Sequence, residues 1–246
     1  MSTQAKLIVF ILALATITVA QQPKTVEGHI QTGIASQRAG KHQEAIQDFA
    51  AALKLEPGNF VAQYGSGLSY MFLEKWDDAA AAFKAALILK ANDAFVHLSL
   101  AKAYGAGGRN SEALNTLKNA VALDPKLFEA HRALAMVYAR LGRRDEAVRA
   151  LTEAAQLRPN DADLLFELGS LHLEGGSFQS ALELFNRVIS VKPTKGMAHM
   201  GLGTVYVRLG DRRAAIAAFQ QAASLEPSNE EALFLSWHVV WSGWKL

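Results

Sequence analysis

Residues Tyr138–Ala147, "YARLGRRDEA", share their pattern with two other stretches of the chain. "YGAGGRNSEA" spans Tyr104–Ala113, and "YVRLGDRRAA" spans Tyr206–Ala215. Each begins with tyrosine, has glycine fifth and alanine tenth, and the starting residues lie 34 and 68 residues apart. A pattern that recurs at a fixed stride of roughly 20–50 residues indicates a repeat architecture.

A period of 34 residues divides most of the chain into six units: 26–59, 60–93, 94–127, 128–161, 162–195 and 196–229. The eighth residue of each unit is glycine or alanine: Gly33, Gly67, Ala101, Ala135, Gly169 and Gly203. The twentieth is always alanine: Ala45, Ala79, Ala113, Ala147, Ala181 and Ala215. The twenty-fourth is large and apolar: Phe49, Phe83, Leu117, Leu151, Phe185 and Phe219. The thirty-second is proline in every unit but the second: Pro57, Pro125, Pro159, Pro193 and Pro227.

These positions have a physical meaning within a pair of helices. Apolar residues recur at spacings of three and four, which predicts two amphipathic helices in each unit. Glycine at the fifteenth position ends the first helix in a left-handed turn, and only the second unit departs, with Glu74. Proline ends the second helix, and Asn59, Asp93, Asp161 and Asn229 are placed to cap the helix that follows. Small residues at positions eight and twenty allow the helices to approach closely, and neighbouring pairs then bury the remaining apolar faces by stacking.

This pattern of small, aromatic and proline positions resembles the tetratricopeptide repeat (TPR) family over residues 26–229. The resemblance implies an all-α fold, a right-handed solenoid of stacked antiparallel helix hairpins. Residues 230–246 are expected to form a C-terminal capping helix. The family's frequent tryptophan at position four is absent here, and four units carry a histidine there: His29, His97, His131 and His199.

The amino terminus has the layout of a secretory signal peptide. Residues 7–20, "LIVFILALATITVA", are apolar, follow Lys6, and end in small or slim residues. We expect cleavage after Ala20, which leaves a short linker at 21–25 and a periplasmic or secreted protein. The alternative is an uncleaved membrane anchor, but fourteen helical residues reach only about 21 Å, short of a hydrocarbon core about 30 Å thick. The chain has no cysteine, which excludes a lipoprotein anchor.

The composition argues against several classes of chemistry. Without cysteine there is no disulfide framework, thiolate nucleophile or thiolate metal site. The net charge is +2 and no long run of one sign occurs, so we expect no nucleic-acid partner. The position-four histidines lie too far apart in stacked helices to supply three ligands to one metal ion. No nucleophile elbow or phosphate-binding loop is present. We expect no catalytic residue, metal or cofactor, and no enzyme activity.

The resemblance also predicts a binding groove lined by positions two, five, nine and twelve of each first helix. Charges are few at these positions, and a face that only meets water would be more polar. The predicted groove residues are Ile30, Ile34, Val61, Tyr64, Leu68, Met71, Phe95, Leu98, Arg132, Met136, Phe166 and Met200. The sequence does not predict that the first repeat binds the terminal carboxylate of a partner, because positions five and nine of this repeat are isoleucines.

The C-terminal stretch "EEALFLSWHVVWSGWKL", residues 230–246, predicts one more apolar helix after the six units. Leu233, Trp237, Val240 and Trp244 fall on one helical stripe, with Phe234 and Trp241 beside it. The helix either docks on the sixth unit, or its tryptophans contact a partner or a lipid interface. Membrane contact is expected only through this segment or the signal segment.

The sequence thus predicts a non-catalytic, exported interaction scaffold of the bacterial envelope that binds a protein or peptide partner in its groove. One alternative is an envelope assembly factor resembling the pilotins of type IV pili or outer-membrane complexes, which carry a lipid on a cysteine that this chain lacks. Another is a regulatory TPR module of an enzyme complex.

Overall fold

The computed structural model describes residues 25–227 and residue 234. Residues 25–227 form twelve helices and no strand, and the helices are joined by short turns. The helices are α2(Val26–Arg38), α3(His42–Leu55), α4(Phe60–Phe72), α5(Trp76–Leu89), α6(Ala94–Ala106), α7(Asn110–Leu123), α8(Phe128–Arg140), α9(Arg144–Leu157), α10(Ala162–Glu174), α11(Phe178–Val191), α12(Gly196–Leu209) and α13(Arg212–Leu225). The predicted all-α fold of stacked helix pairs is confirmed.

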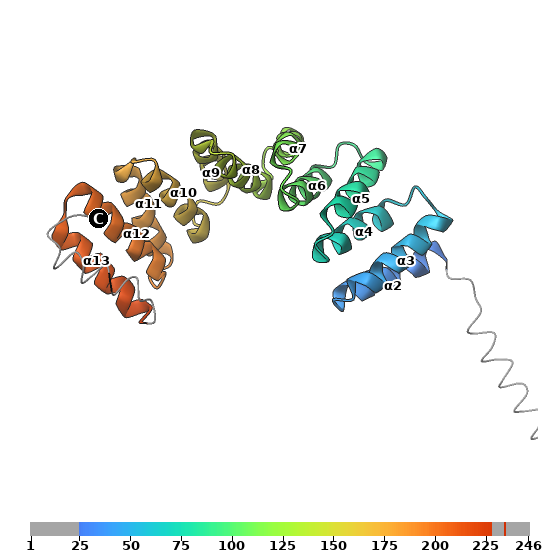
Figure 1. The fold of residues 1–246 in the computed structure, drawn as a ribbon, viewed down its shortest axis with the longest axis horizontal. Helices are drawn as coiled ribbons and strands as arrows, with labels where there is room; N and C mark the ends of the chain where they lie inside the picture. Colours follow the sequence, from blue (N-terminus) through green and yellow to red (C-terminus); the bar gives the residue numbers. More distant parts are fainter. Residues whose placement is uncertain (1–24, 228–233, 235–246) are drawn as a thin grey trace, which may run out of the picture. The chain divides into compact units, whose positions relative to one another are not determined.

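The described residues divide into two compact units, with the boundary between Asn92 and Asp93. The first holds the hairpins α2–α3 and α4–α5, coloured blue to cyan-green in Figure 1. The second holds α6–α7, α8–α9, α10–α11 and α12–α13, coloured green to red. Within each unit the second helix of a hairpin also packs against the first helix of the next. We call the first helix of each hairpin helix A and the second helix B.

Every turn from helix A to helix B has the same hydrogen-bonded geometry. In the opening stretch, the Arg143 amide donates to the Tyr138 carbonyl at 2.9 Å across Gly142, whose φ is +70°. The other four predicted glycines also have positive φ, as expected for a left-handed helix end. In the second 34-residue repeat, Glu74 takes the same conformation, with φ of 57°. The surrounding turn therefore imposes on a glutamate a conformation that ordinarily costs about 1–2 kcal/mol.

Side-chain caps begin several helix A segments where the sequence predicts them. The Asn59 side chain accepts a hydrogen bond from the Ala62 amide at 3.0 Å, and Asp93 and Asp161 cap α6 and α10 in the same way. Each cap satisfies an amide that has no partner inside its own helix. Asn229 lies outside the described residues.

The core repeats one aromatic contact between helix A and helix B. Where the twenty-fourth residue is phenylalanine, the eighth is glycine: Gly33 with Phe49, Gly67 with Phe83, Gly169 with Phe185, and Gly203 with Phe219. A Cβ added to Gly67 would lie 2.5 Å from the Phe83 ring, and one added to Gly203 would lie 2.4 Å from Phe219. Where the twenty-fourth residue is leucine, the eighth is alanine, as in Ala101 with Leu117 and Ala135 with Leu151. The phenylalanine rings fill the space of the missing methyl groups, so the two positions are sterically matched.

The predicted signal segment and almost all of the C-terminal segment lie outside the described residues. Of residues 230–246 only Phe234 is described, and it is helical and exposed. In the part of the chain that is described, no helix combines the length and the apolar character needed to cross a membrane.

Candidate functional site

The groove positions of the first compact unit lie on α2 and α4 and differ widely in exposure. Ile30 is only 5% exposed, so it belongs to the core and offers no surface to a partner. Val61 is exposed, whereas Tyr64 is half-buried, with its ring centroid 5.5 Å from that of Phe83. The buried part of the Tyr64 ring therefore stabilises the α4–α5 hairpin. The remaining predicted groove residues of this unit are half-buried: Ile34, Leu68 and Met71.

The second compact unit carries the other predicted groove residues on α6, α8, α10 and α12. Leu98 is 5% exposed and belongs to the core, as Ile30 does. Phe95 and Met136 are largely exposed. The other three are half-buried: Arg132, Phe166 and Met200. We call the surface formed by helices α6, α8, α10 and α12 the helix-A face of the second unit.

Met136 of α8 and Phe166 of α10 come together in a pocket of about 320 Å³ on this face. Met136 is 50% exposed, and the Phe166 ring packs on the core residue Phe185 at a centroid distance of 5.6 Å. The pocket is lined almost wholly by apolar atoms of residues from α8, α9 and α10: Ala135, Met136, Ala139, Leu151, Phe166, Glu167, Ser170 and Leu171. An open, largely apolar hollow of this kind accepts an apolar side chain.

The small residues Ala139 and Ser170 were not among the predicted site residues. They occupy the twelfth position of the fourth repeat and the ninth of the fifth, which are groove positions. A search for large apolar side chains passes over them, although their small size leaves the space for the pocket. The sequence feature that could have identified Ala139 and Ser170 is a small residue at a groove position beside a large apolar one.

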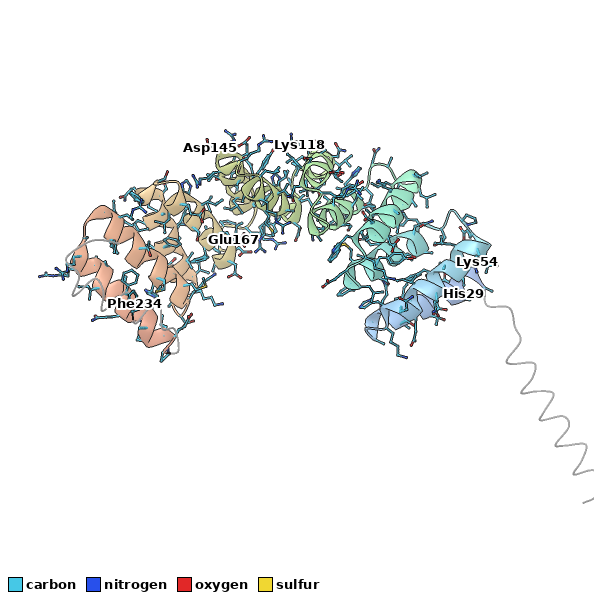
Figure 2. All side chains as sticks on the ribbon, in the orientation of Figure 1. His29, Lys54, Lys118, Asp145, Glu167 and Phe234 are labelled. Atoms are coloured by element: carbon cyan, nitrogen blue, oxygen red, sulfur yellow. The ribbon has the colours of Figure 1, made fainter. Side chains whose placement is uncertain are left out.

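Ion pairs surround the pocket. Arg132 of α8 donates to Glu167 of α10, with its Nε 3.2 Å from Glu167 Oε2, and this hydrogen bond raises the pKa of Arg132. Figure 2 shows Glu167 on the side of this unit opposite Lys118 and Asp145, which belong to helices B. The pair fixes the side of the pocket where α8 meets α10.

A second pair lies beside the Phe166 ring. Lys195 Nζ is 2.5 Å from Asp163 Oδ1 and 4.7 Å from the centroid of that ring. The hydrogen bond from Lys195 lowers the pKa of Asp163. Lys195 thus lies over the face of the Phe166 ring with its charge already paired.

The position-four histidines have structural contacts. His131 is buried and its Nε2 lies 2.9 Å from the Pro125 carbonyl oxygen, while His199 Nε2 lies 3.3 Å from that of Pro193. These contacts join the proline turn to the next helix A. Within residues 25–227 no three side chains are grouped to hold a metal ion.

A further hollow of about 310 Å³ lies between α9 and α10 and includes His172 and Arg144. Burial lowers the pKa of His172, which favours its neutral form. Asp145 is the one acidic side chain of its lining, and no hydrogen bond is found between the Ser177 hydroxyl and the His172 ring: Arg144, Asp145, Val148, Leu171, His172, Gly175 and Ser177. This hollow does not have the arrangement of a catalytic site.

Two-helix repeats of 34 residues that stack through alternating A and B helices define a helical repeat protein of the tetratricopeptide type. Two family models described as tetratricopeptide repeat match residues 132–195 and 196–229. A model described as bacterial transcriptional activator domain matches residues 24–158, more than half of the chain. The chain therefore belongs to the bacterial transcriptional activator domain family and carries tetratricopeptide repeats over residues 132–229. The matches overlap in α8 and α9, where the hairpins of the second unit continue without a change of architecture.

Solved structures share this fold. YrrB, described as a TPR protein with an unusual peptide-binding site, is 20% identical, with a TM-score of 0.66 over 75% of this chain and 95% of that chain. MamA is 27% identical, with a TM-score of 0.64 over 70% and 94%. PilW, described as a widely conserved type IV pilus biogenesis factor, is 20% identical, with a TM-score of 0.68 over 87% and 99%. No curated protein matches the sequence significantly. Tetratricopeptide repeat proteins are typically non-catalytic modules that bind protein or peptide partners.

Proposed function

We propose that this protein is a non-catalytic interaction scaffold that binds a segment of a partner protein on the helix-A face of the second unit. The observation that carries the proposal is the apolar pocket between α8 and α10, with Met136 at its rim and Phe166 in its wall. An apolar side chain of the partner fills this pocket. Removing such a side chain from water stabilises a complex by about 1.5–3 kcal/mol before the costs of association.

The surroundings of the pocket favour one bound geometry. Phe166 rests on buried Phe185, and the Arg132–Glu167 pair fixes the neighbouring rim. A partner therefore meets walls that are already ordered, which lowers the entropic cost of binding. This arrangement supports recognition of a defined segment rather than general adhesion.

Replacing Met136 by glutamate is expected to weaken partner binding at least tenfold. The new carboxylate stands in an apolar pocket beside Glu167, so a bound apolar side chain would have to desolvate it. A photoreactive residue at position 136 first identifies the partner in cells, and the purified partner is then titrated by calorimetry. Met197→Glu is the matched control, because Met197 is 54% exposed on the same face but outside the pocket. Circular dichroism must show both variants folded. Equal affinities of the two variants would rule out the pocket as the binding site.

We further propose that the protein is exported, on the strength of the apolar run at residues 7–20 and the small residues before Gln21. We expect the protein recovered from cells to begin at Gln21 and to lie beyond the inner membrane. Intact-mass measurement of the envelope fraction checks this, and retention of residues 7–20 in the membrane fraction contradicts it.

An envelope assembly factor is the second candidate function. It is favoured by the apolar N-terminal run together with the fold shared with PilW over nearly the whole of that protein. A regulatory module of an enzyme complex is the remaining alternative. The partner crosslinked through position 136 separates these candidates, because it is a pilus or outer-membrane component in the first case and an enzyme in the second.

A further inference from the structure

We propose that the partner segment carries an aspartate or glutamate that pairs with Lys102, close in sequence to the apolar residue that fills the pocket. This inference rests on the proposed function, because it concerns the same bound segment. It adds the chemical class of the ligand: a peptide with one apolar anchor and one nearby carboxylate.

The carboxylates around the pocket are already paired with cations of the protein itself. Glu167 pairs with Arg132, and Asp163 pairs with Lys195. Glu129 of α8 accepts from Arg158 at 2.7 Å. A basic side chain of a partner would therefore have to displace an existing cation, and this surface discriminates against basic segments.

Lys102 is a cation of this face for which no acidic partner is found in the described part of the chain. It is exposed on α6, and no ion pair or hydrogen bond of its amino group is found within residues 25–227. The residues one helical turn away on α6 are Leu98 and Ala106, neither of which is acidic. A carboxylate of a partner can approach this amino group without displacing anything.

Lys102 lies in register with the pocket. It occupies the ninth position of its repeat, as Met136 does 34 residues later, and α6 packs beside α8. Arg140 of α8 also donates to the Gly105 carbonyl of α6 at 2.9 Å, which holds the two helices together. The amino group thus stands one helix away from the Met136 rim.

The spacing sets the pattern expected in the partner. Packed helices lie about 8–10 Å apart, and an extended chain advances about 3.3 Å per residue. The carboxylate is therefore expected about two to four residues from the apolar anchor in an extended segment.

The test is selection of twelve-residue peptides from a randomised display library on the purified full chain. Peptides whose binding is lost in Met136→Glu are kept as pocket ligands. We expect these to carry an aspartate or glutamate near an apolar residue. Lys102→Met, which retains a long side chain without the charge, should weaken the binding of these peptides about three- to fivefold. This is the effect expected for the loss of an exposed ion pair. Lys102→Arg should retain the affinity, and Lys118→Met on α7 is the matched control.

A double-mutant cycle completes the experiment. Changing the peptide's carboxylate to its amide should reproduce the loss caused by Lys102→Met, and the two changes together should cost no more than either one. The Lys102 effect should also diminish as salt is raised. If Lys102→Met leaves affinity unchanged while Met136→Glu abolishes it, the carboxylate inference is wrong and the pocket stands. If selection returns no peptide that depends on Met136, both the inference and the proposed site are wrong.

Discussion

Replacing Phe83 by alanine is expected to lower the free energy of unfolding of the first compact unit by about 3–5 kcal/mol. The Phe83 side chain is fully buried between α4 and α5, with its ring against Gly67 and the Tyr64 ring. Truncation removes a large apolar side chain from the core. It also leaves a cavity that two rigid helices cannot close.

Because repeat arrays can unfold in segments, urea denaturation followed by circular dichroism should be accompanied by hydrogen exchange of α4 and α5. Phe95→Ala is the matched control, since Phe95 is 59% exposed and its loss should change stability by no more than about 0.5 kcal/mol. Similar losses of unfolding free energy in Phe83→Ala and Phe95→Ala would contradict the assignment of Phe83 to the core.

Gly67→Ala is expected to destabilise the same hairpin by about 1–3 kcal/mol through overpacking. Alanine is ordinarily a better helix former than glycine, by about 1 kcal/mol. A net loss of stability would therefore show that the steric cost exceeds this gain in helix propensity. That steric cost arises because the new methyl group would lie 2.5 Å from the Phe83 ring. Thermal and urea melts measure the change.

The decisive control is the double variant Gly67→Ala with Phe83→Leu. It recreates the alanine–leucine pair that the chain already uses at Ala101 with Leu117 and at Ala135 with Leu151. We expect the double variant to be more stable than Gly67→Ala alone, because the shorter leucine leaves room for the methyl group. Strict additivity of the two single changes would show that these positions are not matched.

The helix pairs and their turns could be predicted because each follows from residues close together in the sequence. The 34-residue spacing, the turn glycines such as Gly142 and the caps at Asn59 and Asp161 act within one hairpin. Glu74 shows that the hairpin determines the turn even where its usual residue is missing. Local chemistry repeated in phase is enough to define such an array.

The candidate site could be predicted only in part. Periodicity places Ile30, Leu98 and Met136 on the same face of helix A, yet the structure buries the first two and exposes the third. Exposure depends on the side chains that the next hairpin brings against each position, and no pattern within one helix contains that information. The predicted groove of the first unit accordingly remains a prediction.

The all-α repeat fold follows from the sequence, because its period, turns and sterically matched core pairs are local and recur in phase. The place where an apolar pocket opens, and the charges that pair around it, become visible only once the helices are packed. The small Ala139 and Ser170 leave the pocket open between Met136 and Phe166, and Arg132 finds Glu167 one repeat away. Cavities and ion pairs cannot be predicted from one helix, because they involve side chains on neighbouring helices, whose distances are set by packing between repeats.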